Sequence, residues 1–344
     1  MITIKEMAEI AGVSPTTVAN VLHGRTKKVS KETMEKVQKV IEQSNYVLNM
    51  GARMLGNYGS KIIAVILSYG NRGRANLMQD PFAGSVIGAI EQEVSRNGYF
   101  MMLYTNPDVE ECLHMAMAWN IEGLILLGIQ REEYYRFRSR LDIPIVTIDT
   151  YFEKEDREYI NVGLQDYEGG YQMTEYLIEQ GHRDIAFFSQ VPYDGKIDDT
   201  RYVGHCDALR KHCIPVRPDA HLYLQTESRL RENTLAEFAQ NQFGKNTALF
   251  FSADYLAIEA MNIFFDLGYR IPEDISVVGF DNIPASMQCR PELTTIQQDI
   301  YEKGRKSVEQ VLEIIRRKQK MAAANFQLPV QLVIRGTVKN RANH

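Results

Sequence analysis

The first 44 residues carry three short patterns in which apolar residues repeat at helical spacing, and a helix-start signal opens each one. Thr3 followed by Glu6 fits a capping box at the first helix. Ser14 before Pro15 opens the second helix, and Ser30 caps the third. The apolar faces are formed by Ile4, Met7, Ala8 and Ala11, then by Val18 and Val21, and then by Met34, Val37, Val40 and Ile41. We therefore expect an all-α N-terminal module.

From Ile62 onward the pattern changes, and short apolar runs alternate with amphipathic stretches. The runs lie at 62–67, 99–104, 123–128, 144–149, 184–189, 248–252 and 275–280, and helix-like segments lie at 84–96, 167–180, 202–212 and 255–267. A strand and a long helix follow over 293–319, and a last apolar segment spans 326–336. This alternation predicts an α/β fold with parallel sheets that helices cover on both faces. About 280 residues exceed one comfortable core, so we expect two lobes.

Residues 45–60 form a connector between these regions. Asn49 could cap a short helix over the sequence MGARMLG. Gly51, Gly56 and Gly59 weaken that helix, because each glycine costs about 1 kcal/mol relative to alanine. We expect the segment to become helical only when something holds it.

The charge is unevenly distributed along the chain. The net charge is −5, but residues 1–60 carry +3 and the remainder −8. A basic module on an acidic body is expected if only the module contacts phosphate, although an excess of this size also arises by chance. We see no apolar run long enough for a membrane span and no secretory signal, so we expect a cytoplasmic protein whose four cysteines are free thiols.

The turn at residues 12–13 gives the first two helices the spacing of a helix-turn-helix. In that motif the second helix lies in the major groove and presents its N-terminal side chains to base edges. Pro15, Thr16 and Asn20 would then face the bases, and Asn20 could pair bidentately with adenine. The candidates for phosphate contact at the helix start are Ser14 and Thr17. The alternative is a plain helical hairpin with capping hydroxyls.

Longer motifs identify a family resemblance. The N-terminal part contains TIKEMAEIAGVSPTTVANVLHG, then VSKETMEKVQKVIEQSNY, then NMGARML. Further along come DPF, GLILLG, IPIVTID, GGYQMTEYLIEQGHRDIAFFS, TRYVGHCDALR, GYRIPEDISVVGFDN, PELTTIQQD and LPVQLVIRG. In this order the motifs resemble the LacI/GalR family of bacterial repressors over the whole chain. The resemblance implies a DNA-binding headpiece followed by a two-lobed sensor of the periplasmic-binding-protein type.

The resemblance gives the connector the role of a hinge helix that folds on DNA. Leu55 matches the leucine that the family inserts between base steps of the minor groove, where bent DNA repays the cost of unstacking. Two residues depart from the family, because Leu48 replaces the usual proline and Gly51 replaces a larger apolar residue. Both departures weaken the hinge helix on its own. The candidate DNA contacts are Thr3, Ser14, Pro15, Thr16, Thr17, Asn20, His23, Asn49, Ala52, Arg53 and Leu55.

In the body, the resemblance implies an effector site between the lobes, and open parallel sheets bind ligands outside the carboxyl ends of their strands. Arg201 and Asp281 match effector-contacting positions of the family, and this pair suits a polyol. Phe82 could cover a ring face, whereas Asp254 could instead cap the next helix. Ala253 replaces a common asparagine, so no particular sugar is implied. The effector candidates are Asp80, Phe82, Asp149, Arg201, Asp254 and Asp281.

These inferences combine into one plan for the chain. The expected parts are a headpiece at 1–46, a hinge at 47–60 and an effector-binding domain at 61–344, with one lobe at about 61–162 and 294–322 and the other at about 163–293 and 323–344. The predicted protein is a homodimeric repressor that binds a double-stranded DNA operator and responds to a small molecule, a sugar or sugar derivative. It needs no cofactor, metal or membrane.

Other classes of function remain as alternatives. A solute-binding protein without a regulatory role is the first of them. An enzyme is not expected, because no catalytic constellation is visible. His205, Cys206, His212 and Cys213 have a spacing that could hold zinc, but a buried helix face is the plainer interpretation.

Overall fold

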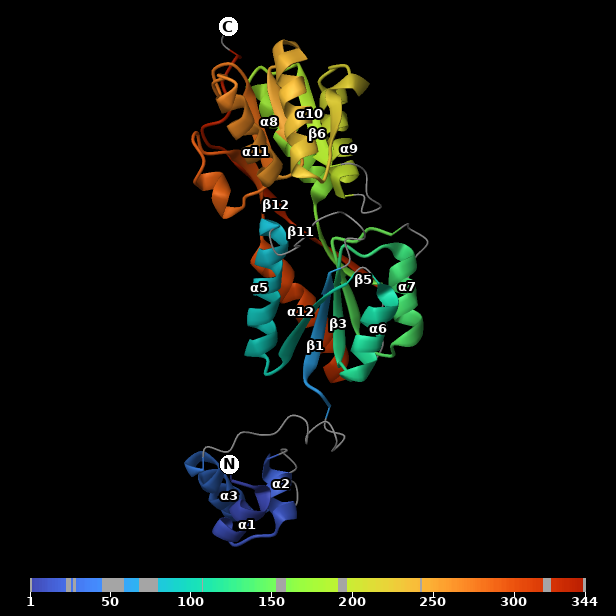
Figure 1. Ribbon diagram of the computed structural model, residues 1–344, viewed down its shortest axis with the longest axis vertical. Helices are drawn as coiled ribbons and strands as arrows, with labels where there is room; N and C mark the ends of the chain where they lie inside the picture. Colours follow the sequence, from blue (N-terminus) through green and yellow to red (C-terminus); the bar gives the residue numbers. More distant parts are fainter. Residues whose placement is uncertain are drawn as a thin grey trace. The chain divides into compact units, whose positions relative to one another are not determined.

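The computed structural model describes residues 2–22, 26, 29–44, 59–67, 80–106, 108–152, 159–190, 197–241, 243–317 and 323–342. The chain divides into two compact units, Met1–Ser60 and Lys61–His344 (Figure 1). Among the helices within these ranges, none is long and apolar enough to cross a membrane.

The first unit contains α1 (Ile4–Ala11), α2 (Pro15–Leu22) and α3 (Lys31–Gln43). The predicted capping box at Thr3 and Glu6 is confirmed, and Gly12 ends α1 in the left-handed conformation with φ 66°. The predicted cap at Ser30 is also confirmed, because the Thr33 amide donates to its hydroxyl. The predicted apolar faces pack together around a core of Met7, Ala8, Val18 and Val37.

The second unit contains two six-stranded sheets, and each forms one lobe. The first sheet has the order β11-β5-β4-β3-β1-β2, and all its pairs are parallel. Its strands are β1 (Ile62–Leu67), β2 (Phe100–Thr105), β3 (Gly123–Leu127), β4 (Ile145–Ile148), β5 (Ile160–Leu164) and β11 (Ala324–Leu328). Its helices are α5 (Pro81–Arg96), α6 (Val109–Ala118), α7 (Arg131–Arg140) and α12 (Ile300–Arg317).

Alternate side chains of β1 show how both faces of this sheet are covered. Ile63, Val65 and Leu67 pack with α5 and α12, whereas Ala64 and Ile66 pack with α6 and α7 (Figure 1). This two-sided burial explains why the strands appear in the sequence as unbroken apolar runs.

The second sheet has the order β12-β10-β9-β8-β6-β7, and only β12 runs antiparallel to its neighbour among the described pairs. Its strands are β6 (Ile185–Gln190), β7 (His221–Leu224), β8 (Ala248–Phe251), β9 (Ser276–Asp281), β10 (Thr294–Gln298) and β12 (Val330–Val333). Its helices are α8 (Asp166–Glu179), α9 (Ile197–Lys211), α10 (Ser228–Asn241) and α11 (Asp254–Asp266). Helices α8 and α9 pack on one face, and α10 and α11 pack on the other.

Sheet membership differs from the expected lobe boundaries near the C-terminus. Strand β10 pairs with β9 in the second sheet, although the sequence plan placed 294–322 in the first lobe. Strand β11 pairs with β5 in the first sheet, although 323–344 was assigned to the second lobe. The apolar segment 326–336 thus supplies strands to both sheets, separated by Pro329, which cannot donate to a ladder. The apolar pattern identifies a strand but not its partner.

Candidate functional site

The predicted recognition helix α2 exposes its N-terminal end. Ser14, Pro15 and Thr16 are exposed, whereas Val18 is fully buried and fixes the rotation of the helix. The Ser14 hydroxyl accepts from the Thr17 amide at 3.1 Å, and the two hydroxyl oxygens lie 2.9 Å apart. The helix start therefore presents hydroxyl groups beside backbone N–H groups, an arrangement that can bind phosphate.

The other DNA-contact candidates divide into two groups. Thr3 is exposed and bonded to Glu6, and Asn20 is half-buried. Five candidates lie outside the described residues, namely His23, Asn49, Ala52, Arg53 and Leu55.

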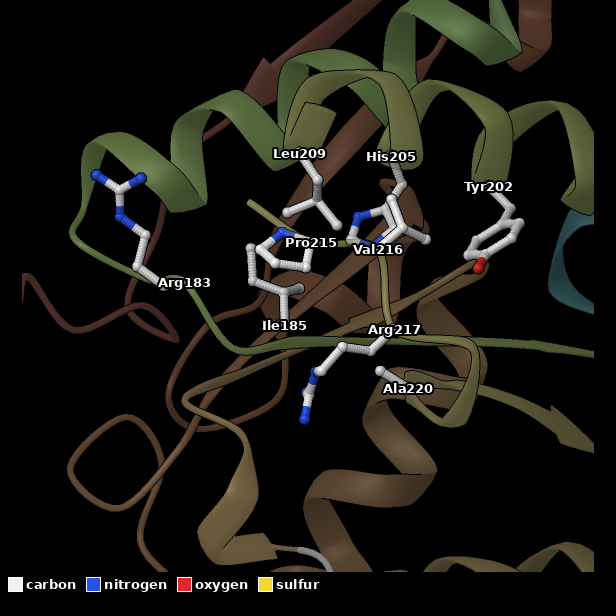
Figure 2. Close-up of a pocket in the computed structure, with 9 residues that line it drawn as sticks. All are labelled: Arg183, Ile185, Tyr202, His205, Leu209, Pro215, Val216, Arg217 and Ala220. Carbon is white, nitrogen blue, oxygen red and sulfur yellow. The ribbon is translucent and has the colours of Figure 1, made fainter. Parts of the chain in front are cut away.

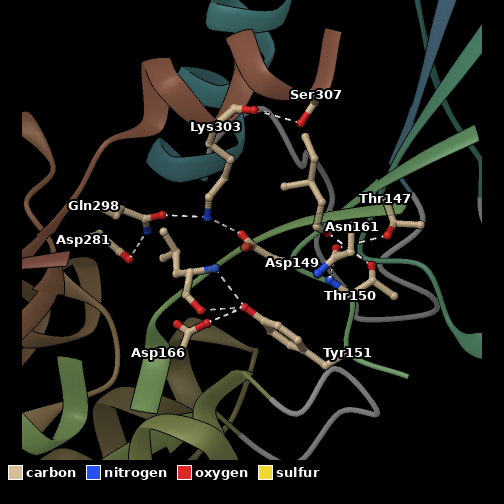
Figure 3. Close-up of polar contacts among 12 residues, drawn as sticks. Thr147, Asp149, Thr150, Tyr151, Asn161, Asp166, Asp281, Gln298, Lys303 and Ser307 are labelled. Carbon is tan, nitrogen blue, oxygen red and sulfur yellow. Dashed lines mark hydrogen bonds and ion pairs between the residues drawn. The ribbon is translucent and has the colours of Figure 1, made fainter. Parts of the chain in front are cut away.

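In the second unit, polar side chains gather where strands of both sheets reach their carboxyl ends (Figure 3). Asp149 directly follows β4 of the first sheet, with φ 50°, and Asp281 ends β9 of the second sheet. Burial raises the pKa of Asp281 to about 7 and also raises the pKa of Asp149. Both carboxyl groups were predicted as site residues, and they belong to one chain of contacts.

Lys303 of α12 connects these two carboxyl groups. Its side chain is fully buried, and its Nζ lies 2.6 Å from Asp149 Oδ2 and 2.8 Å from Gln298 Oε1. Gln298, at the end of β10, donates from Nε2 to Asp281 Oδ1 at 2.6 Å. The ammonium also lies 4.9 Å from the centre of the Phe82 ring. A buried ammonium must have partners of this kind to offset its lost hydration.

Arg201 of α9 continues the chain of contacts on the second sheet. Its Nε donates to Asp166 Oδ1 at 2.9 Å, its Nη1 lies 3.7 Å from Asp281 Oδ1, and its guanidinium lies over the Phe280 ring. Burial alone would lower the pKa of Arg201, but the adjacent carboxylates outweigh burial and raise it. Arg201 therefore stays charged and orients Asp166 and Asp281.

Tyr151, which follows β4 of the first sheet, is the last member of this chain of contacts. Its hydroxyl donates to Asp166 Oδ2 at 2.7 Å and accepts from the Leu164 amide at 3.0 Å. The contacts therefore run from Asp149 through Lys303, Gln298, Asp281, Arg201 and Asp166 to Tyr151, which is two residues beyond their start. We call this set the interlobe ring. It lies beside two chain segments that cross between the lobes. One runs from β5 of the first sheet to α8 on the second, and the other runs from β10 of the second sheet to α12 on the first.

Three of the predicted effector candidates lie at the edge of the ring or outside it. Asp80 caps α5 by accepting from the Phe82 amide at 3.0 Å, and Phe82 packs beneath Lys303. Asp254 is fully buried, and its carboxylate accepts from the Ile283 amide and the Thr295 hydroxyl. Asp254 thus supports the turn after β9 and caps no amide of its own helix through these bonds, so it is left out of the effector site.

A separate small pocket lies near the amino end of β6 (Figure 2). Its lining comprises Arg183, Ile185, Tyr202, His205, Leu209, Pro215, Val216, Arg217 and Ala220. The enclosed space suits about one water molecule, too little for a sugar. In parallel sheets, ligands bind at the opposite ends of the strands, where the interlobe ring lies. His205 bonds to Thr174 and is buried, as expected of a packing residue rather than a metal ligand.

The sequence analysis did not identify four members of the ring. Lys303, Gln298, Asp166 and Tyr151 are absent from the predicted set. Asp166 follows β5, a strand that the apolar pattern did not reveal, whereas Tyr151 lies three residues beyond the end of β4. Lys303 lies in a helix among other charged residues, where a lysine normally faces solvent. Asp166 and Gln298 could have been found from their positions at or just beyond the ends of strands, whereas nothing in the sequence distinguishes Lys303.

Comparisons with known proteins agree with this architecture. A family model described as bacterial regulatory proteins, lacI family, matches residues 3–49, and one described as a periplasmic binding protein-like domain matches residues 174–338. The HTH-type transcriptional repressor PurR of Pasteurella multocida (strain Pm70) is 30% identical, covering 99% of this chain and 100% of the relative. The protein of the same name from Vibrio campbellii (strain ATCC BAA-1116) is 31% identical, covering 98% and 99%.

Solved structures share the fold over almost the whole chain. The lac repressor dimer bound to operator and the anti-inducer ONPF matches with a TM-score of 0.82 and 25% identity, covering 98% of this chain and 99% of that one. The transcriptional regulator CelR in complex with cellobiose matches with a TM-score of 0.73 and 23% identity, covering 98% and 100%. The second likeness shows the fold alone.

Proposed function

Because the chain belongs to the LacI family of DNA-binding bacterial repressors, we propose that it binds one operator sequence and senses a small molecule between its lobes. The observation that carries the sensing role is the interlobe ring, which gathers buried charged groups from both sheets at their carboxyl ends. A ligand that enters this ring changes the contacts that tie the two lobes together, and this provides a route from the ligand to the arrangement of the lobes.

The proposed DNA contacts follow from the exposed start of α2. Ser14 and Thr17 contact phosphate, and Pro15, Thr16 and Asn20 face base edges in the major groove. From the family resemblance we add Thr3, His23, Asn49, Ala52 and Arg53, with Leu55 as a wedge in the minor groove.

The proposed effector is a sugar or sugar derivative, held by Asp149, Arg201 and Asp281 at the centre and by Asp80 and Phe82 at the edge. Carboxyl oxygens accept hydrogen bonds from hydroxyl groups, and an aromatic ring can cover an apolar sugar face. One oxygen of Asp149, Oδ1, is buried without a hydrogen-bond partner among the described residues, so it can accept from a ligand hydroxyl. The regulator CelR, whose fold this chain shares, was solved in complex with cellobiose.

We further propose that two copies of the chain act together in the cytoplasm, without catalysing a reaction. A symmetric dimer places two headpieces on the half-sites of a palindromic operator, and the lac repressor match is a dimer on its operator. An effector that alters lobe closure would change operator affinity about 5–150-fold, for a coupling of about 1–3 kcal/mol.

The test is selection of bound duplexes from a random DNA pool by the purified full chain at a stated salt concentration. We expect one palindromic site to be enriched, and we expect a 1–60 deletion to lose it. The selected operator then allows neutral sugars, phosphorylated sugars and nucleosides to be screened for a change in operator affinity. The DNA-binding proposal fails if no duplex is enriched with or without these compounds. The sugar proposal fails if only nucleosides change the affinity.

A further inference from the structure

Lys303 is one of four residues of the interlobe ring that the proposed effector contacts do not use. Its side chain is 0% exposed, and its partners come from several elements. Asp149 follows β4 of the first sheet, Gln298 ends β10 of the second sheet, and the Phe82 ring belongs to α5. Among the described residues, this ammonium therefore contacts polar groups that belong to both sheets.

Gln298 links Lys303 to Asp281, because its side-chain amide bonds to both residues. The side-chain amide of Gln298 has one acceptor and one donor end. Lys303 donates to the acceptor end, which leaves the donor end facing Asp281. If Lys303 is removed, the acceptor end of Gln298 loses this donor, and among these contacts only the bond to Asp281 still holds the amide. Lys303 thus acts on Asp281 through Gln298, because it holds the acceptor end of the amide whose donor end bonds to Asp281.

We propose that Lys303 is a positioning residue of the effector site: its ammonium ties Asp149 to Gln298 across the connection between the lobes and so fixes the separation of the two carboxyl groups that an effector meets. This inference rests on the proposed effector site. It makes the separation of Asp149 and Asp281 a property of the effector-free protein rather than one that the ligand alone imposes. The ligand then meets a site that is already arranged, which lowers the ordering cost of binding.

The test compares Lys303→Met with Asp149→Asn/Lys303→Met in the full chain. Lys303→Met leaves Asp149 buried without its cation, so we expect a lower unfolding midpoint in urea. The double variant removes both charges, so most of the midpoint should return. The control is Lys306→Met on the same helix, because Lys306 pairs at 3.3 Å with the partly exposed Glu309. It should resemble the wild type.

Hydrogen–deuterium exchange separates positioning from simple stabilisation. We expect exchange to accelerate about tenfold in peptides that span 160–168 and 296–304 in both Lys303 variants, although the double variant has regained its midpoint. The amides of the buried strands β3 and β8 should keep their protection. The proposal is overturned if exchange at these connections matches the wild type in both variants, or if it recovers together with the midpoint. If Lys303→Met does not fold, the double variant alone decides between the same two results.

This experiment needs neither operator nor effector. Wild-type exchange rates in these peptides of the Lys303 variants would therefore refute the positioning role without affecting the proposed regulator. Failure of the operator selection would refute the regulator while leaving the exchange result to stand as a statement about the two lobes.

Discussion

Asp281 is a residue of the interlobe ring whose protonation changes near neutral pH. Burial raises its pKa to about 7, against the opposing effects of Arg201, Gln298 and Lys303, and the negative charge of Asp80 raises it further. An acid whose pKa is higher in the folded state than in the unfolded chain favours folding while it is protonated. Its contribution to stability is therefore lost as pH rises from about 4, where the unfolded carboxyl titrates, to about 7.

The prediction at this scale concerns Asp281→Asn. The variant cannot titrate at this position, so its free energy of unfolding should fall less between pH 4.5 and pH 7.5 than that of the wild type. Arg201 keeps Asp166 as a partner at 2.9 Å, so the variant should fold. Urea unfolding at several pH values measures the difference. Asp266→Asn at an exposed position of α11 is the control and should follow the wild-type profile. Parallel profiles for Asp281→Asn and the wild type would contradict the prediction.

How much of this site could be predicted differs from residue to residue. Asp149 and Asp281 were identified because they follow apolar runs, and strand ends are where parallel sheets bind ligands. Arg201 came from the family resemblance. Lys303 could not be identified, because the burial of a helical lysine depends on which side chains from other elements meet it. Asp254 shows the converse, since the same strand-end rule selected it although its carboxylate supports a turn.

At the scale of elements, the close packing of α8 against α9 places Arg201 beside Asp166. Gly170 of α8 lies against the backbone carbonyl of Arg201, and Gly204 of α9 lies against the backbone carbonyl of Tyr167. A Cβ atom at either position would fall onto a carbonyl group, which cannot turn away as a flexible side chain can. The two glycines therefore set the distance between the helices.

We predict that Gly170→Ala forces α9 away from α8 and separates Arg201 from Asp166. The cost should be about 1–3 kcal/mol of unfolding free energy, as for other overpacked contacts, and effector binding should weaken. The control is Gly88→Ala in α5, where an added Cβ would meet nothing within 4 Å. Gly88→Ala should raise the free energy of unfolding by about 0.4–1 kcal/mol. Urea midpoints measure both variants, and an equal gain in the two would show that the helices tolerate a wider spacing.

The elements themselves were predicted unevenly. Strands with unbroken apolar runs were found because both faces of each sheet are buried. Strand β5 was missed because Asn161 and Gly163 interrupt its apolar pattern. Asn161 is nevertheless fully buried, since its side chain bonds to Thr147 and Asn325. Such a strand is recognised only when its hydrogen-bond partners are known.

At the scale of the whole molecule, the two units have separate hydrophobic cores. The core of the first unit is small and consists of Met7, Ala8, Val18 and Val37 with partly buried neighbours. Small units bury a lower fraction of their surface and are correspondingly less stable. Each lobe of the second unit has a core on both faces of its sheet. The sequence predicted the two-unit plan from a change of periodicity, but the sheet to which β10 and β11 belong depends on long-range pairing.

We therefore predict that the full chain unfolds in two thermal transitions, with the first unit melting at the lower temperature. A ligand that binds only one folded unit raises only the transition of that unit, by an amount that grows with ligand concentration. Operator DNA should thus raise the lower transition, and Gly170→Ala should lower only the upper one. Differential scanning calorimetry measures both. If a single transition moves with both changes, the two units unfold cooperatively, and the headpiece then depends on the second unit for its stability.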